Sequence, residues 1–201
     1  VVANDSVPNF LYHNRRDGTF ENVGYLSGLA VTGDGRAQAS MGIGVGDYNR
    51  DGKVDLYVTA FSDDYNTLFR NEGDGNFTDV THKAGLVSPT IPFLGWGCGF
   101  IDFDNDGLLD IFVANGHVYP AVDRQDWGTT FAQRPQLFRN LDGVRFQEVS
   151  PATGSGLADI IPGRGAAFGD LFNDGHIDVV ISNIDSPPTL LRNVLENGNH
   201  W

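Results

Sequence analysis

Short apolar runs of strand length recur along the chain, and Asp, Asn or Gly residues bound them. One set of runs spans residues 1–4, 56–60, 111–115 and 179–183. A second set, whose members all end in Asn, spans residues 11–14, 68–71, 137–140 and 190–193. A third set opens on an Asp-Gly turn and spans residues 17–23, 74–80 and 142–149. Runs of this length between turn residues predict β-strands.

Glycine alternates with apolar residues in two further runs, at 41–46 and 96–100, which precede the first set. Glycine within a strand marks close approach of another backbone, so we expect this strand to lie innermost, where neighbouring units converge. Residues 55–61 carry apolar side chains on both strand faces, as in a sheet packed between two others. Four short strands per unit, repeated every ~40–60 residues, are typical of β-propeller blades.

We therefore predict an all-β fold, a partial β-propeller whose blades are sheets of four antiparallel strands. The predicted whole blades are residues 39–94 and 95–162, and the partial blades are 1–38 and 163–201. The first partial blade lacks its first strand and the last lacks its fourth, which leaves three, four, four and three strands with residues 1–4 counted as one. Such an arc exposes apolar faces and strand edges, so we expect further blades from the same polypeptide or from another chain.

The amino-acid composition and the net charge exclude several classes of protein. Of the 26 acidic residues 22 are Asp, which favours turns and metal loops over helices. The formal charge of −13 argues against nucleic acid as a partner, because a polyanion needs a basic face. The longest apolar runs are far shorter than the ~20 residues of a transmembrane helix, so we expect no membrane span. The single Cys98 excludes an internal disulfide framework.

Three nine-residue loops carry the main candidate chemistry, because oxygen-bearing side chains stand at their odd positions with glycine at the sixth. The first loop offers Asp47, Asn49, Asp51, Asp55 and the Lys53 carbonyl. The second offers Asp102, Asp104, Asp106, Asp110 and the Leu108 carbonyl. Carboxylates and carbonyls converging in a short loop suit Ca²⁺ better than Mg²⁺, which prefers a rigid octahedral shell. The alternative is that Asp and Gly only form Asx turns between strands.

The third loop departs from this pattern. It offers Asp170, Asp174 and Asp178, but Phe172 stands at the third position, where a phenyl ring cannot ligate a cation. The number of carboxylates predicts that occupancy by metal falls from the second loop to the first and then to the third. The predicted role of the ion is structural, because it would tie the innermost strand to its neighbour.

An insertion at residues 116–135 lengthens the second whole blade. It contains aromatic and basic residues that we expect at the surface, so it is the candidate recognition surface. The expected anchors are Tyr119, Arg124 and Trp127. The alternative is a long loop that packs over the neighbouring blade. No spacing of Ser, His and Asp identifies a nucleophile, and the metal loops already account for nearly every clustered Asp.

The motifs resemble a known family. The Asp-x-Asn/Asp-x-Asp-Gly-x-x-Asp loops, Phe168-Gly169-Asp170 and the Leu-Phe-Arg-Asn elements are similar to FG-GAP/VCBS repeats, the blades also found in integrin alpha-chain propellers. Residues 115–120, 165–170 and 198–201 resemble more narrowly the cartilage acidic protein (ASPIC/UnbV) family and its bacterial relatives. In that family the Gly-Asn-His-Trp at 198–201 opens a further domain, so the resemblance implies that one follows.

The resemblance implies a non-enzymatic calcium-binding scaffold for adhesion, assembly or recognition, with a protein as its partner. The alternative is a carbohydrate-binding or carbohydrate-active propeller, either a lectin or a polysaccharide lyase, with a glycan as its ligand. Calcium sites of modest affinity suit millimolar external Ca²⁺, so we expect an extracellular, periplasmic or cell-surface location.

Overall fold

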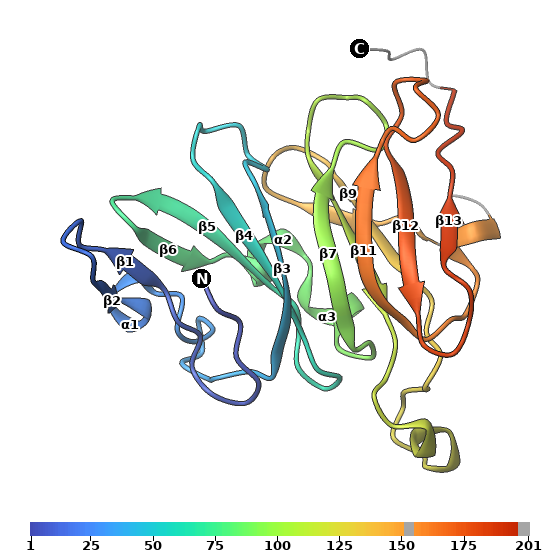
Figure 1. Ribbon diagram of the computed structural model, residues 1–201, viewed down its shortest axis with the longest axis horizontal. Coiled ribbons are helices and arrows are strands. Elements are labelled where there is room, and N and C mark those ends of the chain that lie inside the picture. Colours follow the sequence, from blue (N-terminus) through green and yellow to red (C-terminus); the bar gives the residue numbers. More distant parts are fainter. Residues whose placement is uncertain (151–154, 197–201) are drawn as a thin grey trace.

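The computed structural model describes residues 1–150 and 155–196, and this part of the chain is built from antiparallel sheets joined in sequence order (Figure 1). The second sheet contains β3 (Ser40–Gly46), β4 (Asp55–Ala60), β5 (Thr67–Gly73) and β6 (Asn76–Asp79) in that spatial order. The third sheet contains β7 (Gly95–Ile101), β8 (Asp110–Asn115), β9 (Gln136–Asn140) and β10 (Phe146–Glu148). The predicted all-β fold with four-stranded antiparallel blades is confirmed.

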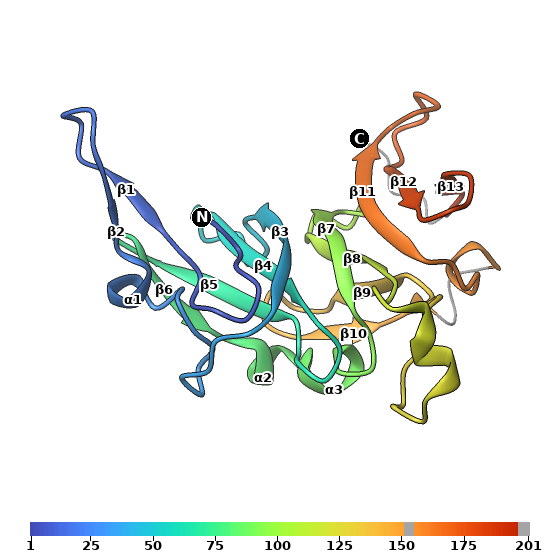
Figure 2. The same ribbon diagram turned by 60° about the horizontal axis from the view of Figure 1, so that its bottom comes forward.

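The end sheets are smaller. The first sheet pairs β1 (Tyr12–Asn14) with β2 (Phe20–Asn22), and the fourth contains β11 (Gly163–Gly169), β12 (Asp178–Asn183) and β13 (Thr189–Leu191). The strand expected at residues 1–4 is not formed. Its only β-type pairing among the described residues is one isolated bridge between Val2 and Phe10, which precedes β1 at Tyr12. Figure 2 shows the sheets fanning out side by side, and within the described residues none closes on itself.

Short helical turns lie between the sheets and, in the case of η1, in the insertion between β8 and β9, and the strand pattern did not predict them. They are α1 (Gly24–Ser27), α2 (Thr81–Ala84), α3 (Val87–Thr90) and the 3₁₀ turns η1 (Pro120–Arg124) and η3 (Ser155–Leu157). Gly28 and Gly85 end α1 and α2 in the left-handed conformation, with φ of 82° and 77°. Across the described ranges no helix combines the length and apolar character needed to cross a membrane.

The glycine-rich strands β3, β7 and β11 lie next to one another across three sheets (Figure 1). A Cβ atom at Gly42 would stand 1.9 Å from the Trp96 carbonyl oxygen, and one at Gly97 would stand 2.3 Å from the Ala166 nitrogen. No real side chain fits at these distances, so the close backbone approach that the glycines predicted is confirmed.

The core lies between successive sheets. Strands β4 and β8 are buried along their whole length, as expected for strands with apolar residues on both faces. Tyr57 and Leu68 of the second sheet pack against Ile111, Val113 and Phe138 of the third. A second cluster of buried apolar side chains joins the third sheet to the fourth. Sheet-to-sheet packing therefore fixes the loops at the strand ends.

Candidate metal centre

The three acidic loops join the first strand of a sheet to its second, so all three follow a glycine-rich strand. Their backbones share one conformation: the fourth residue is left-handed in each loop, with φ of 58° at Arg50, 52° at Asn105 and 53° at Asn173. The glycine two residues later also has positive φ, between 81° and 84°. Glycine adopts this conformation without steric cost, which explains its place in the repeat.

The first carboxylate of each loop holds the turn together. Asp102 accepts the backbone N–H of Asp106 at 3.0 Å and that of Gly107 at 2.8 Å. Asp47 and Asp170 make the same pair of bonds in the first and third loops. The Asx-turn bond, to the N–H two residues further on, is instead made by the fifth-position carboxylate of each loop. The first carboxylate keeps its remaining lone pairs for a cation.

The ninth carboxylate ties the loop to the third strand of its sheet. Asp110 is fully buried and accepts the backbone N–H of Phe103 at 3.1 Å and of Asn140 at 2.7 Å. Asp55 and Asp178 make the equivalent bonds. Burial raises the pKa of Asp110 to about 8 and that of Asp55 to about 6. The structure therefore places this carboxylate in the strand framework, and its part in metal binding stays a prediction.

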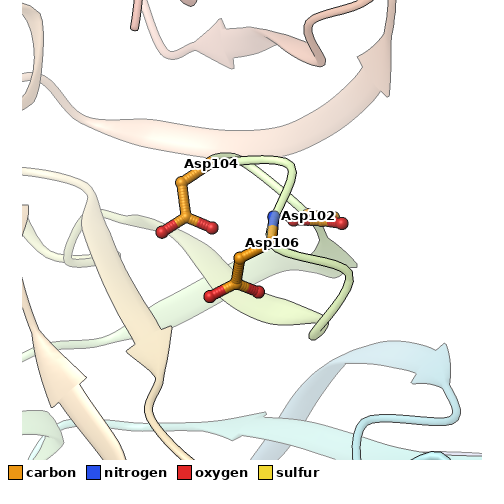
Figure 3. A group of neighbouring side chains, drawn as sticks. All are labelled: Asp102, Asp104 and Asp106. Carbon is orange, nitrogen blue, oxygen red and sulfur yellow. Dashed lines mark hydrogen bonds between the residues drawn. The ribbon is translucent and has the colours of Figure 1, made fainter. Parts of the chain in front are cut away.

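The second loop brings three carboxylates together. Asp102, Asp104 and Asp106 each place one oxygen within 4.8 Å of the others, and Figure 3 shows the three side chains gathered around one turn. In the described part of the chain this is the one group of at least three acidic, His or Cys side chains so close. Asp102 and Asp104 are buried, and burial, with a further contribution from the neighbouring carboxylates, raises the pKa of both. A cation would relieve this repulsion.

Arg139 from β9 neutralises part of this charge. Its guanidinium lies 2.7 Å from an Asp104 oxygen and 3.4 Å from an Asp106 oxygen. The Arg in the recurring Leu-Phe-Arg-Asn element was the signal available in the sequence, but nothing in the sequence placed it over the loop. This arginine and a metal ion would share the same carboxylates.

The first loop gathers fewer charges. Asn49 replaces a carboxylate at the third position, and the Lys53 ammonium lies 3.1 Å from an Asp51 oxygen. The hydrogen bond from Lys53 lowers the pKa of Asp51, which therefore stays ionised without a metal. That the backbone carbonyls of Lys53 and Leu108 act as metal ligands stays a prediction.

The third loop is arranged around an arginine and a phenyl ring. The Arg192 guanidinium carbon lies 4.2 Å from the centre of the Phe172 ring, and the side chain also pairs with Asp174 at 3.0 Å. This hydrogen bond lowers the pKa of Asp174. Arg192 thus takes the place that Arg139 takes in the second loop, while Phe172 offers a π face where Asp104 offers a carboxylate.

Hydrogen bonds that sequence reasoning missed connect the first loop to the third sheet and the second loop to the fourth. Arg50 donates from Nε to the Gly107 carbonyl at 2.7 Å, and Asn105 donates to the Gly175 carbonyl at 3.1 Å. In the opposite direction, Asn140 donates to the Tyr48 carbonyl at 2.9 Å and Asn193 to the Phe103 carbonyl at 2.6 Å. The loops therefore form one linked row along one end of the sheets.

The predicted recognition residues lie at the other end. The insertion leaves from the end of β8 opposite to the second loop and carries η1 (Figure 1). Tyr119 is 59% and Trp127 60% exposed, and Arg124 is exposed as well. At its base the insertion is held by His117, which is buried and accepts the Tyr119 N–H on Nδ1 at 3.1 Å. The insertion and the acidic loops are thus separate surfaces.

Antiparallel blade-like sheets with an acidic loop after each glycine-rich strand define a propeller-type repeat protein. The family model described as FG-GAP-like repeat matches residues 1–58 and 47–113, which together make up more than half of the chain. The chain belongs to this family. The Gly-Asn-His-Trp motif that pointed to a following domain lies outside the described residues.

Three known proteins with sequences similar to this chain share the name cartilage acidic protein 1. Cartilage acidic protein 1 from Homo sapiens is 29% identical over 208 residues, and that from Mus musculus is 27% identical over 208 residues. The Xenopus tropicalis protein of the same name is 26% identical over 205 residues. Each alignment covers 98% of this chain but only 28–29% of the relative. The chain thus spans less than a third of the length of these relatives.

Proposed function

We propose that this chain is a calcium-binding, non-enzymatic propeller scaffold for extracellular recognition, adhesion or assembly. The observation that carries the proposal is the group formed by Asp102, Asp104 and Asp106. Membership of the FG-GAP-like repeat family and the similarity to cartilage acidic protein 1 support an extracellular scaffold.

The residues of the second loop fit a hard divalent cation. They offer carboxylate oxygens from a loop that two backbone N–H groups already hold in shape, and such oxygens are the ligands that Ca²⁺ prefers. Asp102, Asp104 and Asp106 would hold the ion, and it would supply positive charge to carboxylates whose pKa values burial raises. The role is structural, because the loop joins the innermost strand to the rest of the sheet.

Chelation tests the metal proposal. A ligand that binds only the folded state stabilises it by about 2.7 kcal/mol at a hundredfold excess over Kd. For a chain of this size that corresponds to a melting temperature higher by roughly 5–10 °C. We expect a chelator to lower the melting temperature and Ca²⁺ to restore it, with a smaller response in Asp104→Ala, which removes one ligand of the second loop. An unchanged melting curve after verified metal removal would refute the metal role.

The insertion supports recognition as the second part of the proposal. Tyr119 and Trp127 present aromatic surface, and aromatic and Arg side chains dominate binding hot spots. Replacing Tyr119, Arg124 and Trp127 with Ala should abolish capture of a protein partner from extracellular matrix extracts and leave calcium-dependent melting unchanged.

A carbohydrate-binding or carbohydrate-active propeller is the alternative function, and the same exposed aromatic side chains favour it. A glycan array with the wild-type chain and the triple variant separates the two. Loss of glycan binding or cleavage in the variant, without loss of protein capture, would favour the alternative.

A further inference from the structure

Each of the three acidic loops has a positively charged side chain on the carboxylate at its fifth position. In the first loop the cation comes from the loop itself, and in the other two it is an arginine of the third-strand element. The three pairs are Lys53 with Asp51 at 3.1 Å, Arg139 with Asp106 at 3.4 Å and Arg192 with Asp174 at 3.0 Å. The chain therefore supplies a cation of its own to each of these loops.

Arg139 differs from the other two cations because it also pairs with a carboxylate at the third position of its loop. The guanidinium nitrogen that lies 3.4 Å from Asp106 also lies 2.7 Å from Asp104, so one cation bridges two of the three carboxylates gathered in the second loop. The Asp104 side chain is 6% exposed and the Arg139 side chain is 45% exposed. The carboxylate end of this ion pair is thus shielded from water, while the arginine has an open side towards solvent.

The second sheet shows what can hold this arginine away from its loop. Arg70 has the repeat position of Arg139, but it donates to Glu72 from Nε at 2.9 Å and from a terminal nitrogen at 2.6 Å. Residues two apart on a strand share a face, so Glu72 is placed to capture the arginine. The position of Glu72 is taken by Leu141 in the third sheet and by Val194 in the fourth. Neither side chain can pair with a guanidinium, and in both of these sheets the arginine reaches the loop.

A divalent ion in the second loop would need the oxygens that Arg139 already contacts. An ion held by Asp102, Asp104 and Asp106 would add a positive charge beside the guanidinium, and like charges at such short range repel each other. The ion therefore binds at full strength only when the arginine moves out towards solvent, and that movement costs the ion pair. Because the arginine is half exposed, solvent screens part of this cost and its size is modest.

Given the calcium-binding function proposed above, on which this inference rests, we propose that Arg139 is a built-in competitor that weakens Ca²⁺ binding to the second loop. The residue two positions after the arginine decides whether the arginine competes: Glu72 captures Arg70, whereas Leu141 leaves Arg139 free to reach the carboxylates. Arg139 acts on the ion through Asp104 and Asp106 and is a positioning residue, not a ligand. The number of carboxylates alone therefore overstates the affinity of this loop.

Calcium titration of Arg139→Gln tests the competition. Isothermal titration calorimetry of the 201-residue chain at pH 7.5 should show one class of site that binds Ca²⁺ about three- to tenfold more tightly than in the wild type. Arg145→Gln is the matched control, because Arg145 carries the same charge at the same end of the third sheet but pairs with Asp142 in the turn between β9 and β10. At physiological ionic strength this control should change the affinity by less than about twofold.

A second pair of variants moves the arginine without removing it. Leu141→Glu reproduces in the third sheet the arrangement of Arg70 with Glu72, and it should tighten Ca²⁺ binding because the new carboxylate draws Arg139 off the loop. Leu141 is 44% exposed, so the substitution has room. Val144→Glu is the control, since it adds the same charge at a half-exposed position of the same turn and should have a smaller effect.

Stability with and without Ca²⁺ separates competition from a packing role. If Arg139 competes with the ion, Arg139→Gln is less stable than the wild type in chelator and equally stable in saturating Ca²⁺, because the ion pair exists only in the metal-free loop. A residue that only packed β9 in place would destabilise the chain equally in both conditions. Urea denaturation in chelator and in Ca²⁺ measures this difference.

The outcomes distinguish this inference from the calcium function on which it rests. Unchanged or weaker Ca²⁺ binding in Arg139→Gln, an equal gain in Arg145→Gln, or equal gains in Leu141→Glu and Val144→Glu would overturn the competition while leaving the calcium function intact. Absence of Ca²⁺ binding in both the wild type and Arg139→Gln would overturn both. Binding in Arg139→Gln alone would support the competition and show that the arginine replaces the ion in the native loop.

Discussion

At the scale of single residues, the third position of each loop sets how many carboxylates could face an ion. Phe172 occupies this position in the third loop, where Arg192 covers its ring and pairs with Asp174. In the second loop Asp104 pairs with the equivalent Arg139. Among the first, third, fifth and ninth positions, the two loops therefore differ only at the third, while their backbone conformation and their arginine correspond.

Phe172→Asp should convert the third loop into a copy of the second. We expect one additional Ca²⁺ per chain, or tighter binding of an ion already held, because a third carboxylate joins Asp170 and Asp174. Isothermal titration calorimetry measures the stoichiometry. Leu171→Asp adds the same charge one residue away and should leave the stoichiometry unchanged. Equal titration of both variants would show that net charge, and not the ligand position, matters.

We expect His117 to contribute to the pH dependence of stability. Burial lowers its pKa, and its Nδ1 accepts the Tyr119 N–H only when the ring is neutral. Between the lowered pKa of the folded state and the ordinary value near 6.5, the unfolded chain binds more protons, so the free energy of unfolding falls as pH falls. The raised pKa values of Asp110 and Asp55 act in the opposite direction, and they do so in the wild type and in His117→Asn alike. In urea unfolding at pH 7.5 and 5.5, the free energy of unfolding of the wild type should therefore fall relative to that of His117→Asn, which keeps an acceptor. Equal changes in both proteins would exclude a contribution from His117.

At the scale of elements, the structure separates two roles for the carboxylates of one loop. Asp110 bonds backbone groups of the loop and of β9, whereas Asp104 faces Asp106 and Arg139. The first role joins strands and needs no ion. The second gathers charge that an ion would neutralise.

Two substitutions distinguish these roles. In chelator, Asp110→Ala should lower the free energy of unfolding by about 3 kcal/mol, because two buried N–H groups lose their acceptor. Asp104→Ala should cost about 1 kcal/mol or less, since its partner Arg139 is half exposed. Added Ca²⁺ should stabilise Asp110→Ala more than it stabilises Asp104→Ala. Urea denaturation with and without Ca²⁺ measures both, and a large cost for Asp104→Ala in chelator would contradict the assignment.

At the scale of the whole molecule, the glycine-rich strands decide how closely successive sheets approach. At Gly97 the nearest atoms are all backbone atoms of β11, which no rotamer change can move aside. A Cβ at Gly169, at the far end of β11, would meet nothing within 4 Å. The same residue type thus serves close packing at one end of the interface and has free space at the other.

Gly97→Ala should destabilise the chain by about 1–3 kcal/mol, because the third and fourth sheets must move apart. Gly169→Ala should change the free energy of unfolding by less than about 0.5 kcal/mol. Thermal melts in chelator compare the two variants without interference from metal. A neutral Gly97→Ala would mean that the two sheets are not held in this contact in solution.

The repeat in the sequence determined the strands, their order, the loops and the close approach at the glycines, because alternation, turn residues and glycine act through short-range geometry. It did not indicate the single helical turns, which depend on buried contacts such as those of Ser27 and Ala84. The sequence also predicted a strand at residues 1–4, where the structure has one isolated bridge and no strand. Only the tertiary structure placed Arg139 over the acidic loop, joined the loops through Arg50 and Asn105, and assigned Asp110 to backbone bonds. Apart from the bond between Phe103 and Asp110, these contacts connect residues 30 to 70 positions apart, and the packing of whole sheets brings them together, which no local pattern encodes.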